Sequence, residues 1–85
     1  MDDHLSTQQM GWILDRSPGS VRDMIRKGEI EGVRLPAGFR VPKAEALRVA
    51  RQRIETEAGR KLSDRDLERL VDELIATNEQ RIDGA

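Results

Sequence analysis

Residues 17–42, SPGSVRDMIRKGEIEGVRLPAGFRVP, carry the features that decide the predicted fold. Ser17 is a good N-cap, and Pro18 suits the first helical position, where its missing N–H would have had no partner. Apolar residues then recur at helical spacing, at Val21, Met24 and Ile25. Because Gly28 supplies the backbone freedom that commonly ends a helix, we expect a short helix with one apolar face and one polar, basic face.

Two short runs after this helix alternate apolar and basic residues around the turn sequence Pro36-Ala37-Gly38. They are Val33-Arg34-Leu35 and Phe39-Arg40-Val41. This pattern predicts a small β-hairpin, which Pro42 closes. Successive side chains of a strand point to opposite faces. We therefore expect the apolar residues to pack on the helices, while Arg34 and Arg40 project together from the other face.

Upstream of this stretch, Ser6 and Gln9 have the spacing of a capping box and predict a helix over residues 7–14. Only Asp15 and Arg16 separate this helix from the Ser17 cap. Such a short link forces the two helices to cross steeply, as in a helix-turn-helix. Asp15 suits the left-handed conformation that a link of this length needs.

Downstream, residues 43–58 predict a third helix, which Gly59 ends. Ser63 then caps a last helix within residues 62–83. Its apolar residues form the stripe of a straight amphipathic helix: Leu67, Leu70, Val71, Leu74 and Ile75. This stripe either folds back on the preceding residues or pairs with the same helix of a second protomer. We therefore expect residues 1–58 to form one domain, followed by a C-terminal helix that packs on it or oligomerises.

Charge is distributed unevenly along the 85 residues, although the net charge is only −1. Residues 5–53 contain ten Lys or Arg against five Asp or Glu, whereas residues 54–85 contain five against nine. Many such asymmetries only keep a surface solvated. Here the basic residues coincide with the predicted helix and hairpin, so the pattern favours a nucleic-acid partner for the first part of the chain.

Composition excludes several classes of protein. The chain has no cysteine, so it forms no disulfide and no cysteine-based zinc site. No apolar run approaches the roughly 20 residues that cross a bilayer, and the start MDDH lacks the regions of a signal peptide. We expect a soluble, cytoplasmic protein with no membrane partner, and we expect His4, the only histidine, to lie in a frayed terminus. Nothing resembles a phosphate-binding loop, a metal cluster or an activated nucleophile, so we expect neither an enzyme nor a cofactor.

Residues 5–47, about half of the chain, resemble the winged helix-turn-helix of the excisionase and MerR-like superfamily without a gap. The matching segments are Leu5-Ser6 with Gln8-Gln9, Ser17, Val21 through Ile25, Gly28-Glu29-Ile30, Val33-Arg34-Leu35 and Phe39-Arg40-Val41-Pro42. The resemblance implies a mainly α fold with a small β-hairpin wing, followed here by a C-terminal amphipathic helix. It also implies that the second helix enters the major groove of DNA and that the wing contacts the backbone or the minor groove.

Residue chemistry suggests roles within this surface. Arg22 is the best candidate to read a base, because an arginine fork pairs well with guanine, and Arg26 lies one helical turn away. Exposed N–H groups and the helix dipole favour a phosphate at Ser17, Gly19 and Ser20. For each basic residue alone, a solvated surface role remains open. The full set of predicted DNA-contacting residues is Arg16, Ser17, Gly19, Ser20, Arg22, Arg26, Lys27, Arg34, Arg40 and Lys43.

Three functions fit these observations. The first, to which the resemblance and the small size point, is a phage or mobile-element excisionase. Such a recombination directionality factor binds adjacent sites and bends double-stranded DNA, so that a tyrosine or serine integrase favours excision. The second is a small transcription regulator of the same superfamily that binds an operator as a dimer. The third is an interaction adaptor whose acidic last helix docks a recombinase or a packaging-motor subunit.

Overall fold

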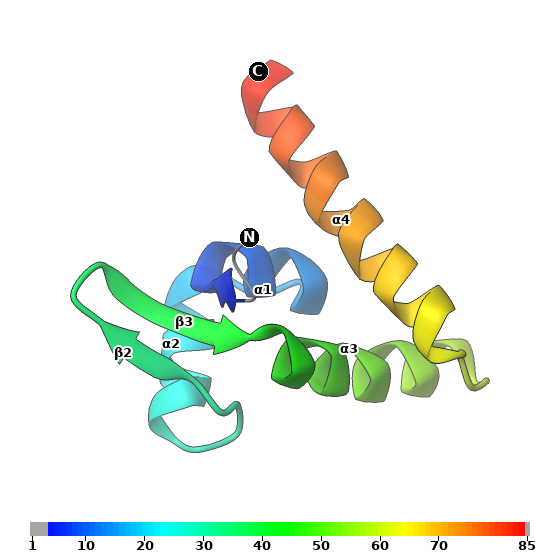
Figure 1. Ribbon diagram of the computed structural model, residues 1–85, viewed down its shortest axis with the longest axis horizontal. Helices are drawn as coiled ribbons and strands as arrows, with labels where there is room; N and C mark the ends of the chain where they lie inside the picture. Colours follow the sequence, from blue (N-terminus) through cyan, green and yellow to red (C-terminus); the bar gives the residue numbers. More distant parts are fainter. Residues whose placement is uncertain (1–3, 85) are drawn as a thin grey trace.

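The computed structural model describes the backbone of residues 4–84 and the side chains of residues 4–80. Figure 1 shows a mainly helical chain with a small antiparallel sheet. The elements are β1 (His4–Ser6), α1 (Thr7–Leu14), α2 (Pro18–Arg26), β2 (Val33–Leu35), β3 (Gly38–Pro42), α3 (Lys43–Ala58) and α4 (Asp64–Gly84). The helices predicted over residues 7–14 and 43–58 are confirmed, and the last helix begins directly after its predicted cap.

Side-chain caps start the helices as the sequence predicts. The backbone N–H of Gln9 donates to Ser6 Oγ over 3.1 Å, and Gln9 Oε1 accepts the Ser6 N–H over 2.9 Å, which completes the capping box. Ser17 caps α2 and Ser63 caps α4 through the same kind of hydroxyl contact. Each of these bonds satisfies a backbone donor that the start of a helix leaves without a partner.

The link between α1 and α2 is tight. Asp15 adopts the predicted left-handed conformation, with φ 55° and ψ 49°. The N–H of Arg16 donates to the carbonyl oxygen of Gly11 over 2.9 Å. An added Cβ at Gly11 would lie 2.4 Å from the Arg16 carbonyl oxygen. Glycine therefore allows the backbone after α1 to turn this closely over the helix, a requirement that periodicity and capping signals do not reveal.

The sheet contains a strand, β1, that the sequence pattern does not predict. β3 is the central strand and pairs antiparallel with β1 on one side and β2 on the other. Leu5 of β1 lies opposite Val41, and both are buried, which explains why the residues before α1 are extended. The expectation that His4 frays is wrong, because His4 lies opposite Pro42 in this pairing.

The observed register of the hairpin shows that the predicted faces of its strands are wrong. Val33 lies opposite Arg40, and Arg34 lies opposite Phe39. Residues opposite each other share a face of the sheet, so the two arginines project from opposite faces rather than together. The reason is the length of the turn. With two residues between the strands, each odd-numbered residue of β2 lies opposite an even-numbered residue of β3. A shift of the pairing by one residue would move the side chains of one strand to the opposite face. Val33 and Leu35 are consequently 42% and 45% exposed instead of packing on the helices.

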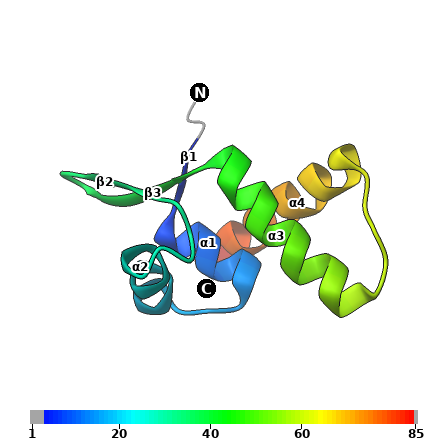
Figure 2. The same ribbon diagram turned by 90° about the horizontal axis from the view of Figure 1, so that it is seen from below.

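One core joins the sheet to the four helices of the described chain. Its buried residues are Leu5, Met10, Ile13, Leu14, Val21, Ile30, Val41, Ala46, Val49, Ala50, Leu67 and Val71. α4 reaches this core by packing against α1 and α3 (Figures 1 and 2). In the stripe of α4, Leu67 and Val71 are buried and Ile75 packs against the core, whereas Leu70 and Leu74 are partly buried. The stripe thus folds back on its own chain.

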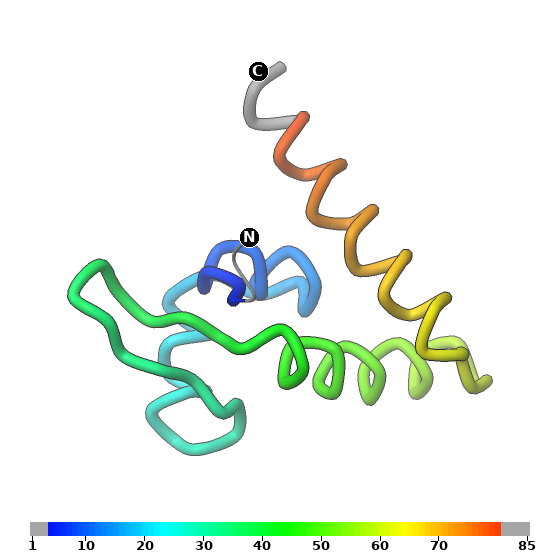
Figure 3. The backbone as a smooth tube through the Cα atoms, in the orientation of Figure 1, coloured from blue at the N-terminus to red at the C-terminus, as the bar shows by residue number. Residues whose placement is uncertain are grey.

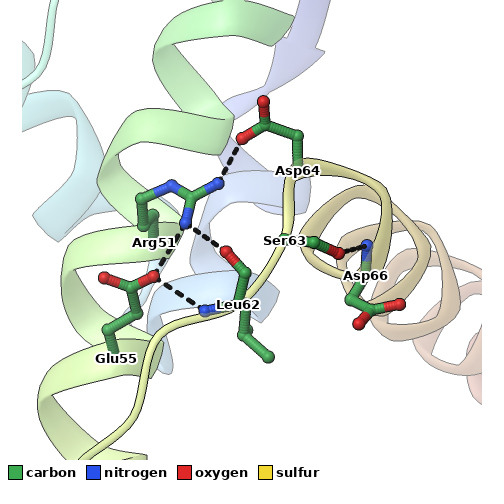
Figure 4. Close-up of polar contacts among 6 residues, drawn as sticks. All are labelled: Arg51, Glu55, Leu62, Ser63, Asp64 and Asp66. Atoms are coloured by element: carbon green, nitrogen blue, oxygen red, sulfur yellow. Dashed lines mark hydrogen bonds and ion pairs between the residues drawn. The ribbon is translucent and has the colours of Figure 1, made fainter.

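Arg51 of α3 fastens the start of α4 (Figure 4). Its guanidinium donates to Glu55 Oε2 over 2.7 Å and to the Leu62 carbonyl oxygen over 2.6 Å, and it forms an ion pair with Asp64. Glu55 Oε2 in turn accepts the N–H of Leu62 over 3.0 Å. That backbone N–H, together with the Arg51 guanidinium, holds the pKa of Glu55 below its usual value. These bonds set the path by which the chain turns from α3 into α4.

We expect Gly11→Ala to destabilise the fold by about 1 to 3 kcal/mol, because the new methyl group would overlap a backbone carbonyl that cannot move without opening the turn. The matched control is Gly19→Ala in α2, where a Cβ would meet only Arg22 Nη2 at 3.7 Å and Ser17 Oγ at 3.9 Å. The control variant should be at least as stable as wild type, because alanine favours a helix over glycine. Chemical denaturation of both variants measures the difference. Equal stabilities of the two variants would contradict the role of Gly11.

Because the pKa of Glu55 is lowered in the folded state, its carboxylate stabilises the fold above the usual glutamate pKa. This contribution is lost as the pH falls through the folded-state pKa. We therefore expect Glu55→Gln to be less stable than wild type at neutral pH, with a difference that shrinks toward acid pH. Urea unfolding over a pH series measures it, with Glu57→Gln, which removes only a surface partner of Arg53, as the control. A difference that stays constant with pH would count against this role.

Candidate nucleic-acid interface

α2 and the β2–β3 hairpin lie together at one end of the molecule. In Figures 1 and 2 the hairpin projects beyond the helical body next to α2, whereas α4 begins at the opposite end. The backbone tube in Figure 3 shows that the loop after α2 leads into β2. The predicted contact residues of α2 and of the hairpin therefore share one end of the fold.

The first turn of α2 presents two hydroxyl groups and a guanidinium. Ser17 Oγ accepts the N–H of Ser20 over 3.1 Å, and the two hydroxyl oxygens are 3.1 Å apart. Arg22 Nη2 lies 3.7 Å from the position that a Cβ on Gly19 would occupy, so its guanidinium reaches back over this turn. Both serines and Arg22 are exposed. Hydroxyl groups and a cation at a helix start are suited to a phosphate or to the edge of a base.

The second half of α2 carries charges of both signs. Arg26 Nη1 donates to Asp23 Oδ1 over 3.1 Å, and both side chains are mostly exposed. A shallow hollow beside this pair is lined by Arg16, Ser20, Asp23, Met24, Lys27 and Glu29. Asp23 and Glu29 would repel a phosphate from the hollow itself, so the hollow is suited to groups of both polarities; Arg26 does not line it. The carboxylate beside Arg26 is a feature that charge counting along the chain does not reveal.

Phe39 connects α2 with the hairpin. Arg26 Cζ lies 5.7 Å and Arg34 Cζ lies 6.0 Å from the centroid of its ring, distances at which a guanidinium is attracted to an aromatic face. Arg40, which projects from the other face of the hairpin, donates from Nη1 to the Phe39 carbonyl oxygen over 3.0 Å. The alternation of residues in the sequence suggests only a packing role for Phe39, and no local signal reveals its contact with two arginines.

The cations of this surface differ from those of α3 in whether they form ion pairs. Every Lys and Arg side chain of α3 is paired with a carboxylate: Lys43, Arg48, Arg51 and Arg53. Five predicted contact residues, in contrast, have no carboxylate within 4.0 Å among the side chains of residues 4–80: Arg16, Arg22, Lys27, Arg34 and Arg40. We call these five residues the unpaired cations. Their charges are available to attract an anion.

Lys43, like Arg26, is a predicted contact residue that has a carboxylate partner. Its Nζ lies 3.2 Å from Glu68 Oε1 and 3.4 Å from Asp72 Oδ1, so it fastens α3 to α4. The hydrogen bond to Glu68, against a smaller opposing effect of burial, raises the pKa of Lys43, and Asp72 adds to the increase. The structure therefore sets Lys43 apart from the unpaired cations.

Glu45 of α3 holds the loop that leads from α2 into the hairpin. Its Oε2 accepts the Glu31 N–H over 2.8 Å, and Arg48 donates to both of its oxygens over 2.7 Å. The hydrogen bonds from Arg48, and secondarily that from the Glu31 backbone, lower the pKa of Glu45 although burial opposes them. Glu31 and Glu45 are 14 positions apart, so no local pattern in the sequence predicts this contact.

Comparison with protein-family models, with curated proteins and with solved structures finds no match for this chain. In the described part of the chain, no cluster of three or more His, Cys, Asp or Glu side chains could hold a metal ion. No described helix combines the length and the apolar character needed to cross a bilayer. The case for a function therefore rests on the geometry and charge of α2 and the hairpin.

Proposed function

We propose that the chain is a double-stranded DNA-binding protein, built as a winged helix-turn-helix followed by a C-terminal amphipathic helix. α2 is then the recognition helix that enters the major groove, and the β2–β3 hairpin is the wing. The observation that carries the proposal is the set of unpaired cations on α2, on its flanking residues and on the hairpin, against the paired cations of α3. A surface of this kind attracts a polyanion, because its charges have no partner within the protein to compensate them.

Each part of the surface has its own task in this docking. Arg22 reads a base, and the start of α2 at Ser17 and Ser20 binds a backbone phosphate. Arg34 and Arg40 project from opposite faces of the hairpin, which suits a wing that lies in a groove and meets a phosphate strand on either side. The wing then holds the backbone while α2 supplies sequence preference.

The biological role that fits best is that of a phage or mobile-element excisionase, which bends DNA and directs a tyrosine or serine integrase toward excision. The arrangement of α4 favours this role over a dimeric regulator. Leu67 and Val71, at the centre of its apolar stripe, are buried within their own chain rather than offered to a second copy. Protomers would then associate along DNA at adjacent sites, and the role places the protein in the cytoplasm.

Selection of bound duplexes from a random pool, followed by footprinting and a bending assay, tests this proposal. Adjacent protected sites in phase with the helical repeat, together with a bend, are the result expected for an excisionase. A single symmetric operator without phased repeats would instead indicate the transcription regulator. Failure to enrich any duplex would overturn DNA binding and leave the adaptor function, in which α4 docks a recombinase or a packaging-motor subunit.

We expect Arg22→Ala to lose about 1 to 3 kcal/mol of preference for the selected site while it keeps most of its affinity for unrelated duplexes. Arg40→Ala should weaken binding to all sequences and reduce the slope of log K against log salt by about 1. The matched control is Arg53→Ala, which removes a cation that Glu57 already compensates, and it should change neither quantity. Anisotropy titrations over a salt series measure all three variants. Equal losses in Arg40→Ala and Arg53→Ala would refute the assigned surface.

A further inference from the structure

Phe39 occupies an unusual place for the only phenylalanine of the chain. Val41, two residues later on the same face of β3, is completely buried. Phe39 stays partly exposed and lies outside the buried core. A large aromatic side chain in this position gives up part of the stabilisation that full burial would supply, so a role besides packing accounts better for it.

Two like charges share this ring. Arg26 Cζ lies 5.7 Å and Arg34 Cζ lies 6.0 Å from the ring centroid, and the two guanidiniums come from α2 and β2. The ring attracts each guanidinium and so brings cations from two different elements to one residue. Asp23 compensates Arg26 at 3.1 Å, whereas Arg34 is one of the unpaired cations. An anion beside the ring could therefore accept hydrogen bonds from both guanidiniums.

The same contacts limit what Arg26 can bind. Its Nη1 donates to Asp23, and its guanidinium lies over the Phe39 ring at the side of the hairpin. Bidentate pairing with guanine needs a guanidinium fork that is free to align with the edge of the base. A phosphate oxygen accepts a hydrogen bond from whichever N–H remains available. The position of Arg26 is therefore better suited to the backbone than to a base.

We propose that Phe39 is a positioning residue, which holds Arg26 and Arg34 as one pair for a DNA backbone phosphate at the junction of α2 and the wing. This inference rests on the proposed DNA-binding function and assigns both arginines to phosphate rather than to bases. The pair requires the aromatic face and not merely the bulk of the side chain, because the attraction to a cation comes from the ring quadrupole. The ring thereby couples the recognition helix to the wing.

Two substitutions separate the aromatic face from bulk. Phe39→Leu keeps an apolar side chain and removes the face, whereas Phe39→Trp keeps a face. We expect Phe39→Leu to bind a labelled mixed-sequence duplex of about 30 base pairs roughly 3- to 10-fold more weakly, with the same loss for unrelated sequences. Phe39→Trp should bind within about twofold of wild type. Thermal unfolding of both variants identifies any loss of affinity that comes from loss of folding.

A double-mutant cycle tests the pair while Phe39 stays in place. Arg26→Ala and Arg34→Ala should each weaken binding, and the double variant should lose clearly less than the product of the two single losses. The reason is that a phosphate held by two arginines is largely released when either is removed. Arg16→Ala combined with Arg34→Ala is the matched control, because Arg16 does not contact the ring, and its losses should multiply.

The possible results lead to separate conclusions. Wild-type affinity in a folded Phe39→Leu variant would overturn the inference and leave the DNA-binding function standing. The same conclusion would follow from multiplicative losses of Arg26 and Arg34, or from a loss in Phe39→Leu that Phe39→Trp does not restore. If Phe39→Leu does not fold, the cycle decides alone. Failure of the wild-type chain to bind the duplex at low salt would overturn both the inference and the proposed function.

Discussion

The antiparallel pairing of β3 with both of its neighbours is the constraint on which the rest of the structure depends. β3 is the central strand, and Val41 is completely buried opposite Leu5 of β1. This pairing ties the start of α1 to the start of α3, so that helices distant in the chain share one core. It also determines which face of the hairpin lies near α2, and with it the placement of Phe39 and Arg34.

Ion pairing distinguishes the cations of α3 from most of those on α2 and the hairpin. Carboxylates of α4 compensate cations of α3, since Glu68 and Asp72 bind Lys43 and Asp64 binds Arg51. The acidic C-terminal part of the chain therefore has a structural use, which is to fasten α4 to α3. The unpaired cations have no such carboxylate partner among the described side chains, so they can replace the counterions of a polyanion.

Prediction from the sequence succeeded where the deciding interactions are local. The cap of α1 at Ser6 and the end of α3 at Gly59 involve hydrogen bonds across a few residues, so their signals are present in the sequence. β1 could not be predicted in this way, because its three residues merge with the cap of α1 and its partner strand lies far along the chain. In the candidate site, the roles of Arg22 and Arg40 rest on residue type and stay predictions, whereas no local signal in the sequence reveals the contact of Phe39 with two arginines.

By itself the sequence determined where the helices begin and end, which of their faces are apolar, and where basic residues gather. Each of these properties depends on neighbours within one or two helical turns. Only the tertiary structure decided which cations form ion pairs with carboxylates and which arginines lie over the Phe39 ring. Lys43 pairs with Asp72, which is 29 positions away in the sequence. The hairpin register places Arg34 and Arg40 on opposite faces of the sheet. The packing of α4 and the register of the strands bring together residues that are far apart in the sequence, and no periodic pattern in the sequence predicts such contacts.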